Sequence, residues 1–168
     1  MNKSNFRRYF LRNISCFILL ISLFFYSASR AESKVEITYQ DGNSIKRSLE
    51  SLRDLDYQTW QVVAYPNYEE EGCIVLRIVG YPGSLRLNHP STLFVRSGIK
   101  TWELKDITLD NYQLSNDARE AAAEFNLEPL LLDLTQNRPL RLFLKDAFNE
   151  LPVPPYIVKE WRSLQIDG

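Results

Sequence analysis

Apolar and polar residues alternate in the part of the chain that follows an N-terminal apolar run. The alternation covers residues 35–39 and resumes over residues 45–49, with Asp41-Gly42 between the two segments. A period of two residues is typical of strands with one buried face, and Asp-Gly favours a hairpin turn. The pattern therefore predicts an antiparallel hairpin with a loop longer than two residues.

Two more hairpins are predicted further along the chain. Residues 59–65 and 73–79 are β-rich segments, joined by a loop that begins at Pro66 and ends at Gly72. Apolar residues occupy both alternating sets in the second segment, so we expect both faces of that strand to be partly covered. Residues 93–96 and 101–107 make the third pair, around Ser97-Gly98.

The period changes after residue 116. Residues 117–127 are rich in helix formers, and Asp117 and Glu120 have the spacing of a capping box. We expect a helix here with Phe125 on its apolar side, a short second helix from Pro129, and a returning strand over residues 139–144. The sum predicts an α+β domain, with one antiparallel sheet of about six to seven strands and two or three helices packed against it.

The C-terminal segment is predicted to be a helix that closes the core. Pro155 suits the first helical position, and Ile157, Trp161 and Leu164 then fall on one stripe. Lys159, Glu160 and Ser163 are expected to point away from that stripe. A strand and a free proline-rich docking tail are the alternatives, because Tyr-Ile-Val is β-rich and residues 152–155 supply P-x-x-P. In the favoured reading, Arg162 and the proline entry stay available for contacts outside the fold.

The first 31 residues have the organisation of a secretory signal peptide. A basic segment without acids precedes a 13-residue apolar run over residues 14–26, which is too short to span a membrane comfortably. Small residues at Ser29 and Ala31 suit a signal peptidase, so we expect cleavage between Ala31 and Glu32. An uncleaved anchor is the alternative, because Arg30 is unusual beside a cleavage position. In both cases we expect residues 32–168 to form a single exported domain.

Export changes the charge and the cysteine content of the chain. The chain has 20 basic and 21 acidic residues, and residues 1–31 hold five of the basic ones and none of the acidic ones. The exported part therefore has 15 basic and 21 acidic residues, a net charge of −6. This balance argues against binding to nucleic acid and against adsorption to anionic lipid, both of which need clustered Lys and Arg. Cys16 leaves with the signal, so Cys73 has no partner for an internal disulfide and is expected to be a half-buried strand residue. Pairing with another chain and a reactive thiol are the alternatives.

Few residues are suited to catalysis or metal binding. His89 is the only histidine, and Asn88-His89-Pro90 predicts a turn with an exposed or backbone-bonded ring. Asp54 and Asp56 would face one side of an extended segment, but a hydrolytic pair also needs burial that raises one pKa. One His and one Cys are too few for a zinc site. We therefore predict no catalytic, cofactor or metal site.

Two further segments have simple interpretations. Glu69-Glu70-Glu71 lacks the alternating spacing of a calcium loop and is expected to be a solvated hairpin tip. The segment from Gly80 to Gly83 lacks the lysine and the helix of a phosphate-binding loop, so we expect a turn.

Four segments of the chain carry a resemblance to a known family. They are WQVV (residues 60–63), LRIVGYPG (76–83), HP (89–90) and VPPYIVKEWR (153–162). They resemble an uncharacterised family of exported cyanobacterial proteins, the domain of unknown function DUF3122. The resemblance implies a periplasmic or thylakoid-lumen location, and it implies no functional residue.

Three functions compete on these observations. The leading hypothesis is a non-catalytic accessory or binding protein that docks on a protein complex of the envelope or thylakoid lumen and touches the membrane only through an uncleaved signal. The second is a carrier of a small apolar ligand, held in a pocket lined by residues such as Trp102 and Leu131. The third is an exported hydrolase that uses Asp54, Asp56 or His89. The residues that we select as candidates for partner contacts are Trp161, Arg162, His89 and Tyr81.

Overall fold

The computed structural model describes residues 35–40, 43–67, 73–81, 87–116 and 122–165, and half of these residues lie in two antiparallel sheets. These residues all belong to one unit of the chain, residues 33–168. The strands of the first sheet, in their spatial order, are β1 (Val35–Gln40), β2 (Asn43–Arg53), β3 (Thr59–Pro66), β4 (Ile74–Val79) and β7 (Ala122–Asn126). Those of the second sheet are β6 (Lys100–Leu104), β5 (Leu93–Ser97), β8 (Leu140–Leu144) and β9 (Phe148–Val153).

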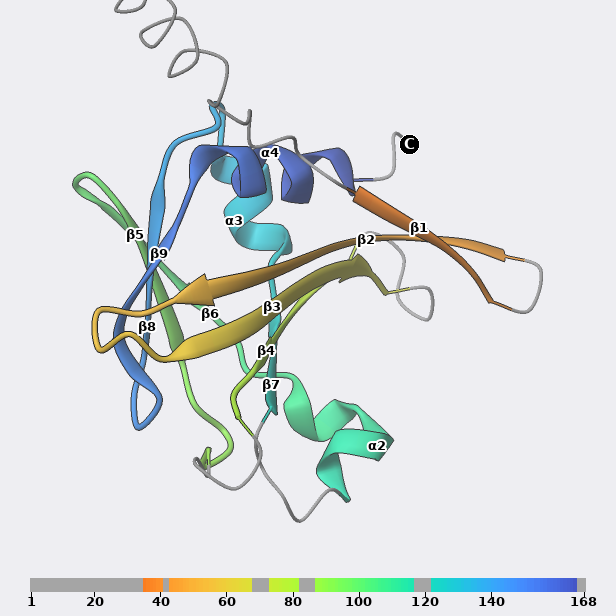
Figure 1. The fold of residues 1–168 in the computed structure, drawn as a ribbon, viewed down its shortest axis with the longest axis horizontal. Helices are drawn as coiled ribbons and strands as arrows, with labels where there is room; N and C mark the ends of the chain where they lie inside the picture. Colours follow the sequence, from red (N-terminus) through yellow and green to blue (C-terminus); the bar gives the residue numbers. More distant parts are fainter. Residues whose placement is uncertain (1–34, 41–42, 68–72, 82–86, 117–121, 166–168) are drawn as a thin grey trace, which may run out of the picture. The chain divides into compact units, whose positions relative to one another are not determined.

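Short helical segments follow and connect these strands. They are the 3₁₀ turn η1 (Thr108–Asp110) and the helices α2 (Tyr112–Ser115), α3 (Glu128–Asp133) and α4 (Pro155–Ser163). Figure 1 shows α3 and α4 together on one side of the β2–β3 ribbon. The predicted α+β class is therefore confirmed for the described residues.

The three predicted hairpins are present as β1–β2, β3–β4 and β5–β6. In β3–β4, Val62 lies opposite Ile78 and both point into the core. The β5–β6 turn places Gly98 at φ +61, a left-handed conformation that glycine adopts without steric cost. The expectation that the first hairpin has a loop longer than two residues is wrong, because Gln40 lies opposite Asn43 and only residues 41–42 separate the two strands. The acidic segment at residues 69–71 lies outside the described residues.

The expectation of one sheet with six to seven strands is wrong, because the described residues form nine strands in two sheets. The edge of β4 is taken by β7, with Ile78 opposite Ala123. Strand β5 pairs instead with β8, where Val95 lies opposite Leu142. Strand β9, which the sequence pattern did not predict, then completes the second sheet.

The helix expected over residues 117–127 is also wrong in its second half, which is strand β7. Ala123 and Phe125 are fully buried in the core, while Glu124 lies on the other face opposite Arg77. Tertiary packing and one cross-strand ion pair therefore override the helix propensity of Ala and Glu. The proposed capping box at Asp117 and Glu120 lies outside the described residues.

Helix α4 closes the core as predicted. It begins at Pro155, and Ile157, Trp161 and Leu164 are all buried. One detail of the prediction is wrong: Glu160, expected to point away, is only 1 % exposed. Its Oε2 accepts a hydrogen bond of 2.5 Å from Ser48 Oγ on β2, which satisfies part of the need of a buried carboxylate for donors.

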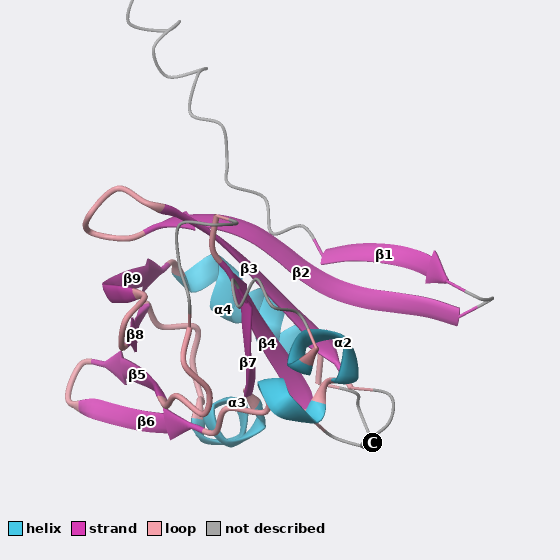
Figure 2. Ribbon diagram, turned by 90° about the horizontal axis from the view of Figure 1, so that it is seen from below, coloured by secondary structure: helices cyan, strands magenta, loops and turns pink. Residues whose placement is uncertain are grey.

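One hydrophobic core fills the space between the two sheets, α3 and α4. The rings of Trp60 and Phe148 meet edge to face with centroids 5.0 Å apart and so join the two sheets. A backbone hydrogen bond of 3.3 Å from Leu55 N to Glu150 O also ties the β2–β3 turn to β9, and Figures 1 and 2 both place β9 beside that turn.

Candidate functional site

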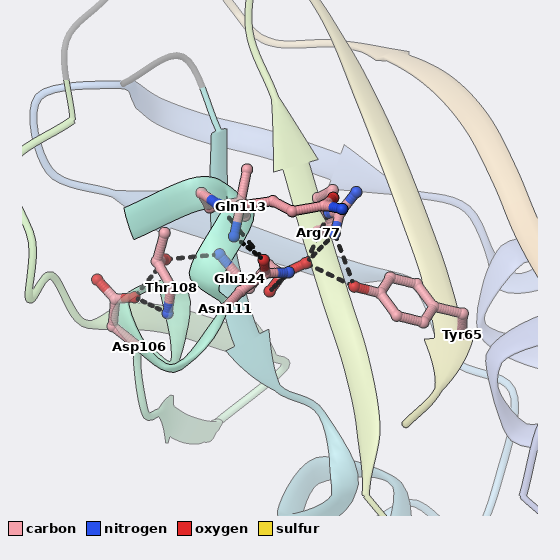
Figure 3. Close-up of polar contacts among 8 residues, drawn as sticks. Tyr65, Arg77, Asp106, Thr108, Asn111, Gln113 and Glu124 are labelled. Carbon is pink, nitrogen blue, oxygen red and sulfur yellow. Dashed lines mark hydrogen bonds and ion pairs between the residues drawn. The ribbon is translucent and has the colours of Figure 1, made fainter. Parts of the chain in front are cut away.

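A polar cluster lies on the face of β3, β4 and β7 that points away from the core, with Glu124 at its centre (Figure 3). Oε1 of this buried carboxylate accepts hydrogen bonds from Tyr65 Oη at 2.5 Å and Arg77 Nε at 2.6 Å. Oε2 accepts one from Asn111 Nδ2 at 3.1 Å. Asn111 also caps α2, because its Oδ1 accepts from the backbone N–H of Gln113 at 3.0 Å.

A second set of contacts continues from this cluster to His89. The Glu124 N–H donates to Thr108 Oγ1 at 2.8 Å, and that hydroxyl donates to Asp106 Oδ1 at 2.5 Å. Asp106 Oδ2 accepts from the Ser91 N–H at 2.7 Å and lies 2.7 Å from His89 Nδ1. A connected path of hydrogen bonds therefore runs from His89 to Tyr65.

Burial and hydrogen bonding shift three pKa values in this path. Burial raises the pKa of Tyr65, and the hydrogen bond to Glu124 raises it further. Burial alone would lower the pKa of Arg77, but the charge of Glu124 and the interactions with Tyr65 together outweigh it, and the net shift is upward. Burial alone would raise the pKa of Asp106, yet hydrogen bonds from Thr108, His89 and the Ser91 N–H hold it below its ordinary value. At neutral pH these shifts favour a neutral Tyr65 and charged Arg77 and Asp106.

The arrangement of these groups is that of an anchor for the segment η1–α2. Thr108 and Asn111 hold this segment against β7, and the charges of Arg77 and Glu124 neutralise each other. The sequence analysis missed this cluster. A signal was available, because Arg77 interrupts an otherwise apolar strand and must meet a partner if that face is covered.

The hydrolase candidates do not come together in the described residues. Asp54 is buried and organises the β2–β3 turn, where its carboxylate accepts from the N–H of Asp56 and Gln58 and from Trp60 Nε1 at 2.8–2.9 Å. Asp56 itself is exposed. His89, expected to be exposed or bonded to backbone, has a side chain only 10 % exposed and bonds to the Asp106 carboxylate.

The outward face of β5 and β8 is the second polar region of interest. Phe94 lies directly opposite Phe143, and Arg96 lies directly opposite Arg141. We call these four residues the Arg–Phe face. Glu150 on β9 forms an ion pair with Arg141 and lies 3.9 Å from Arg96 Nη2. The Arg96 guanidinium also lies over the Phe143 ring, 4.6 Å from its centroid.

A hollow lies at each end of the Arg–Phe face. The first has a volume of about 570 Å³ and lies between the Arg–Phe face, the β2–β3 turn and the β8–β9 turn. Its lining includes Phe94, Phe143, Asp56, Lys145, Asp146 and Phe148. The second has a volume of about 350 Å³ and is lined by Arg96, Ser97, Gly98, Arg138, Pro139 and Arg141. The alternation of Phe and Arg at outward positions could have indicated this face from the sequence, once the pairing of β5 with β8 was known.

The remaining residues that the sequence singled out do not belong to the Arg–Phe face. Trp161 is fully buried in the core, so it is not available to a partner. Arg162 Nη1 donates to Asn137 Oδ1 at 2.7 Å, which corrects the expectation that this side chain stays free. Tyr81 is exposed at the end of β4, and Cys73 is buried at the residue before β4. The cleavage position between Ala31 and Glu32 lies outside the described residues.

Two features are absent from the described residues. These residues contain no group of three or more His, Cys, Asp or Glu side chains placed to hold a metal ion. Within the same ranges, no helix has the length and apolar character needed to cross a membrane.

Comparisons with known proteins bear on the family alone. Neither the curated proteins nor the solved structures gave a significant match. Residues 33–164 match the model of a family described as "Protein of unknown function (DUF3122)", which confirms the resemblance seen in the sequence. The chain belongs to this family.

Proposed function

We propose that this protein is an exported, non-catalytic accessory protein that docks on a protein complex through the Arg–Phe face. The observation that carries the proposal is the pairing, on adjacent strands, of the exposed Phe94 with the half-buried Phe143 and of the exposed Arg96 with the exposed Arg141. Phe and Arg are enriched in the buried centres of protein interfaces, where they supply large apolar contact and directional hydrogen bonds.

Folding stability explains this arrangement only in part, through the contact of Arg96 with the Phe143 ring and the ion pairs of Glu150. Like charges directly opposite each other on adjacent strands destabilise a sheet, and within the described part of the chain Glu150 is the one acid that pairs with Arg96 and Arg141. Phe94 is 41 % exposed although the core side of the same strand is fully packed. A partner that covers the rings and supplies an acid would compensate both features.

The proposed location rests on the sequence of residues 1–31. Their basic segment, apolar run and small residues before Glu32 favour export to a periplasm or thylakoid lumen. A complex of the envelope or thylakoid membrane is then the partner that such a protein would meet.

The alternative functions receive less support from the contacts. A carrier was expected to hold its ligand near Trp102 and Leu131, but Leu131 is packed in the core and Trp102 Nε1 donates to Asp133 at 2.9 Å. Neither of the two hollows described above is lined by these residues. The hydrolase was expected to combine Asp54, Asp56 and His89, but the carboxylate that His89 contacts is Asp106, and Asp54 accepts its hydrogen bonds within the β2–β3 turn and from Trp60.

Site-specific photocrosslinking in the native host tests the docking proposal. The full-length chain carries benzoylphenylalanine in place of Phe94, or in place of Gln61, which is exposed on β3 of the other sheet. We expect one discrete crosslinked protein from position 94, none from position 61, and loss of the product when Phe143→Ser is added. Equal crosslinking from both positions, or a product that survives Phe143→Ser, would contradict the proposal.

A further inference from the structure

The second hollow has a marked excess of positive charge. Arg96, Arg138 and Arg141 line it, and its remaining lining residues Ser97, Gly98 and Pro139 carry no charge. This concentration contrasts with the net charge of −6 over residues 32–168. A local basic site on an acidic domain creates a field that favours one place for an anion.

The groups around the hollow leave most of this charge uncompensated. Glu150 forms its ion pair with Arg141 and is 3.9 Å from Arg96, so one carboxylate serves two guanidinium groups. The guanidinium of Arg138 bonds to the neutral Gln136 Oε1, at 3.3 Å from both Nε and Nη2. Lys100, near the same β5–β6 turn, contacts Asp133 and so has its own acid. Counted over the described residues, three arginines and one acid leave a net charge of about +2 at the hollow.

The chemistry of the arginines indicates an oxyanion. Guanidinium groups bind carboxylates in a planar, two-pronged geometry, and they stay charged at any physiological pH. The side chains of Arg96 and Arg141 are about half exposed, at 49 % and 56 %, so their remaining N–H groups can reach a ligand. The space beside Gly98 is open, because a methyl group built at this position would meet no atom within 4 Å.

The rings of Phe94 and Phe143, next to the arginines, indicate that the ligand also carries an apolar group. Phe94 and Arg96 occupy successive outward positions of β5, as Phe143 and Arg141 do on β8. Successive outward positions are about 7 Å apart along a strand. An extended peptide that runs along β5 and β8 has the same spacing between its residues i and i+2, so one side chain can face the arginines while the next faces the rings.

We propose that the hollow lined by Arg96, Arg138 and Arg141 binds the carboxylate of an acidic residue in an extended segment of the partner protein, with an apolar side chain two residues away packed on Phe94 and Phe143. This inference rests on the proposed function and specifies the chemistry of its partner. A bilayer surface is the rival occupant, because Ile99 at the adjacent turn is fully exposed. One aliphatic side chain on an acidic domain gives little membrane affinity, so the charge pattern favours the peptide.

Fluorescence anisotropy with the full-length chain in non-ionic detergent tests the inference. The probe is a fluorescein-labelled heptapeptide, Gly-Ser-Glu-Ser-Phe-Ser-Gly, with Glu→Gln and Phe→Ser versions as matched ligands. We expect saturable binding of the first peptide and affinities about fivefold lower for each altered peptide, as exposed ion pairs allow. Arg141→Gln should give a similar loss, while Lys46→Gln, which removes an exposed charge from β2, should change the affinity less than about twofold.

Several results would overturn the inference. Equal binding of the Glu and Gln peptides, equal losses for Arg141→Gln and Lys46→Gln, or no binding of any peptide would each do so. Vesicles of phosphatidylglycerol that bind the chain through Arg141 while the peptides do not would assign the hollow to a membrane instead. The docking proposal is tested separately, because crosslinking from position 94 does not require a carboxylate. If crosslinking from position 94 persists but no peptide binds, the docking proposal stands and the inference of an acidic ligand is wrong.

Discussion

Gly80 lies so close to Trp60 that a methyl group on the glycine would come within 2.8 Å of the indole Cζ3 atom. The ring is 1 % exposed and fixed by the hydrogen bond from Nε1 to Asp54 and by its edge-to-face contact with Phe148. It therefore has little room to move. We predict that Gly80→Ala lowers the free energy of unfolding by about 1–3 kcal/mol, as overpacking of a core does. Urea denaturation of both chains measures the change.

A double-mutant cycle checks the cause of that loss. In the Trp60→Phe background the smaller ring leaves room for the methyl group, so Gly80→Ala should cost less than it does in the parent. The same cost in both backgrounds would show that the contact with Trp60 is not responsible.

Trp161→Ala should be among the most destabilising substitutions in α4. The side chain is fully buried, and its removal leaves a large cavity beneath the helix. We expect a loss of about 3–5 kcal/mol, measured by thermal and urea denaturation. Lys159→Ala, on the exposed side of the same helix, is the matched control and should change stability by less than about 0.5 kcal/mol. A stable Trp161→Ala protein would favour the free docking tail after all.

Alkaline pH should destabilise the protein through Tyr65. Its pKa is raised by burial and by Glu124, so the folded state keeps the phenol proton at a pH where the unfolded chain has lost it. This contribution is fully present below about pH 10, the ordinary value for Tyr, and is lost as the pH rises beyond it. Tyr65→Phe should remove this part of the pH dependence, whereas Tyr112→Phe on the exposed side of α2 should not. Identical alkaline profiles for all three chains would contradict the role of the Tyr65–Glu124 bond.

Acid should destabilise the protein through Asp106. Hydrogen bonds hold the pKa of this carboxyl below its ordinary value of 3.8, so the folded state favours the charged form. Its contribution is present above about pH 4 and is lost as the pH falls through the lowered folded pKa. Asp106→Asn should lower stability at pH 7 and flatten the profile below pH 4, as followed by circular dichroism. The exposed Asp110→Asn is the control, and an equally steep acid profile in Asp106→Asn would contradict the assignment.

Local pattern was a sufficient guide for the hairpins and for α4. In β3 the alternation of buried and outward residues follows the sequence pattern, and in β4 both alternating sets are mostly apolar, which predicted that both faces are covered. In α4, Pro155 and the stripe through Trp161 identify both the start of the helix and its buried side. These features depend on residues close together in the chain.

Pairing between distant strands could not be predicted in the same way. Residues 122–126 have helix-forming composition, and they become β7 because β4 offers a free edge, a core pocket for Phe125 and a cation for Glu124. The burial of Glu160 has a similar origin, since its donor Ser48 is 112 positions away in the chain. Contacts of this kind outweigh intrinsic propensities of less than about 1 kcal/mol per residue.

The sequence by itself determined the α+β class and the closing helix, because composition and short-range periodicity carry both. The family follows from the resemblance of short motifs, and the expectation of export from the N-terminal segment. Only the tertiary structure decided that the strands divide into two sheets and that β5 lies beside β8. That pairing brings Arg96 to Arg141 and Phe94 to Phe143 across more than 40 residues of chain. The candidate binding face is therefore a product of long-range strand register, which local sequence pattern does not encode.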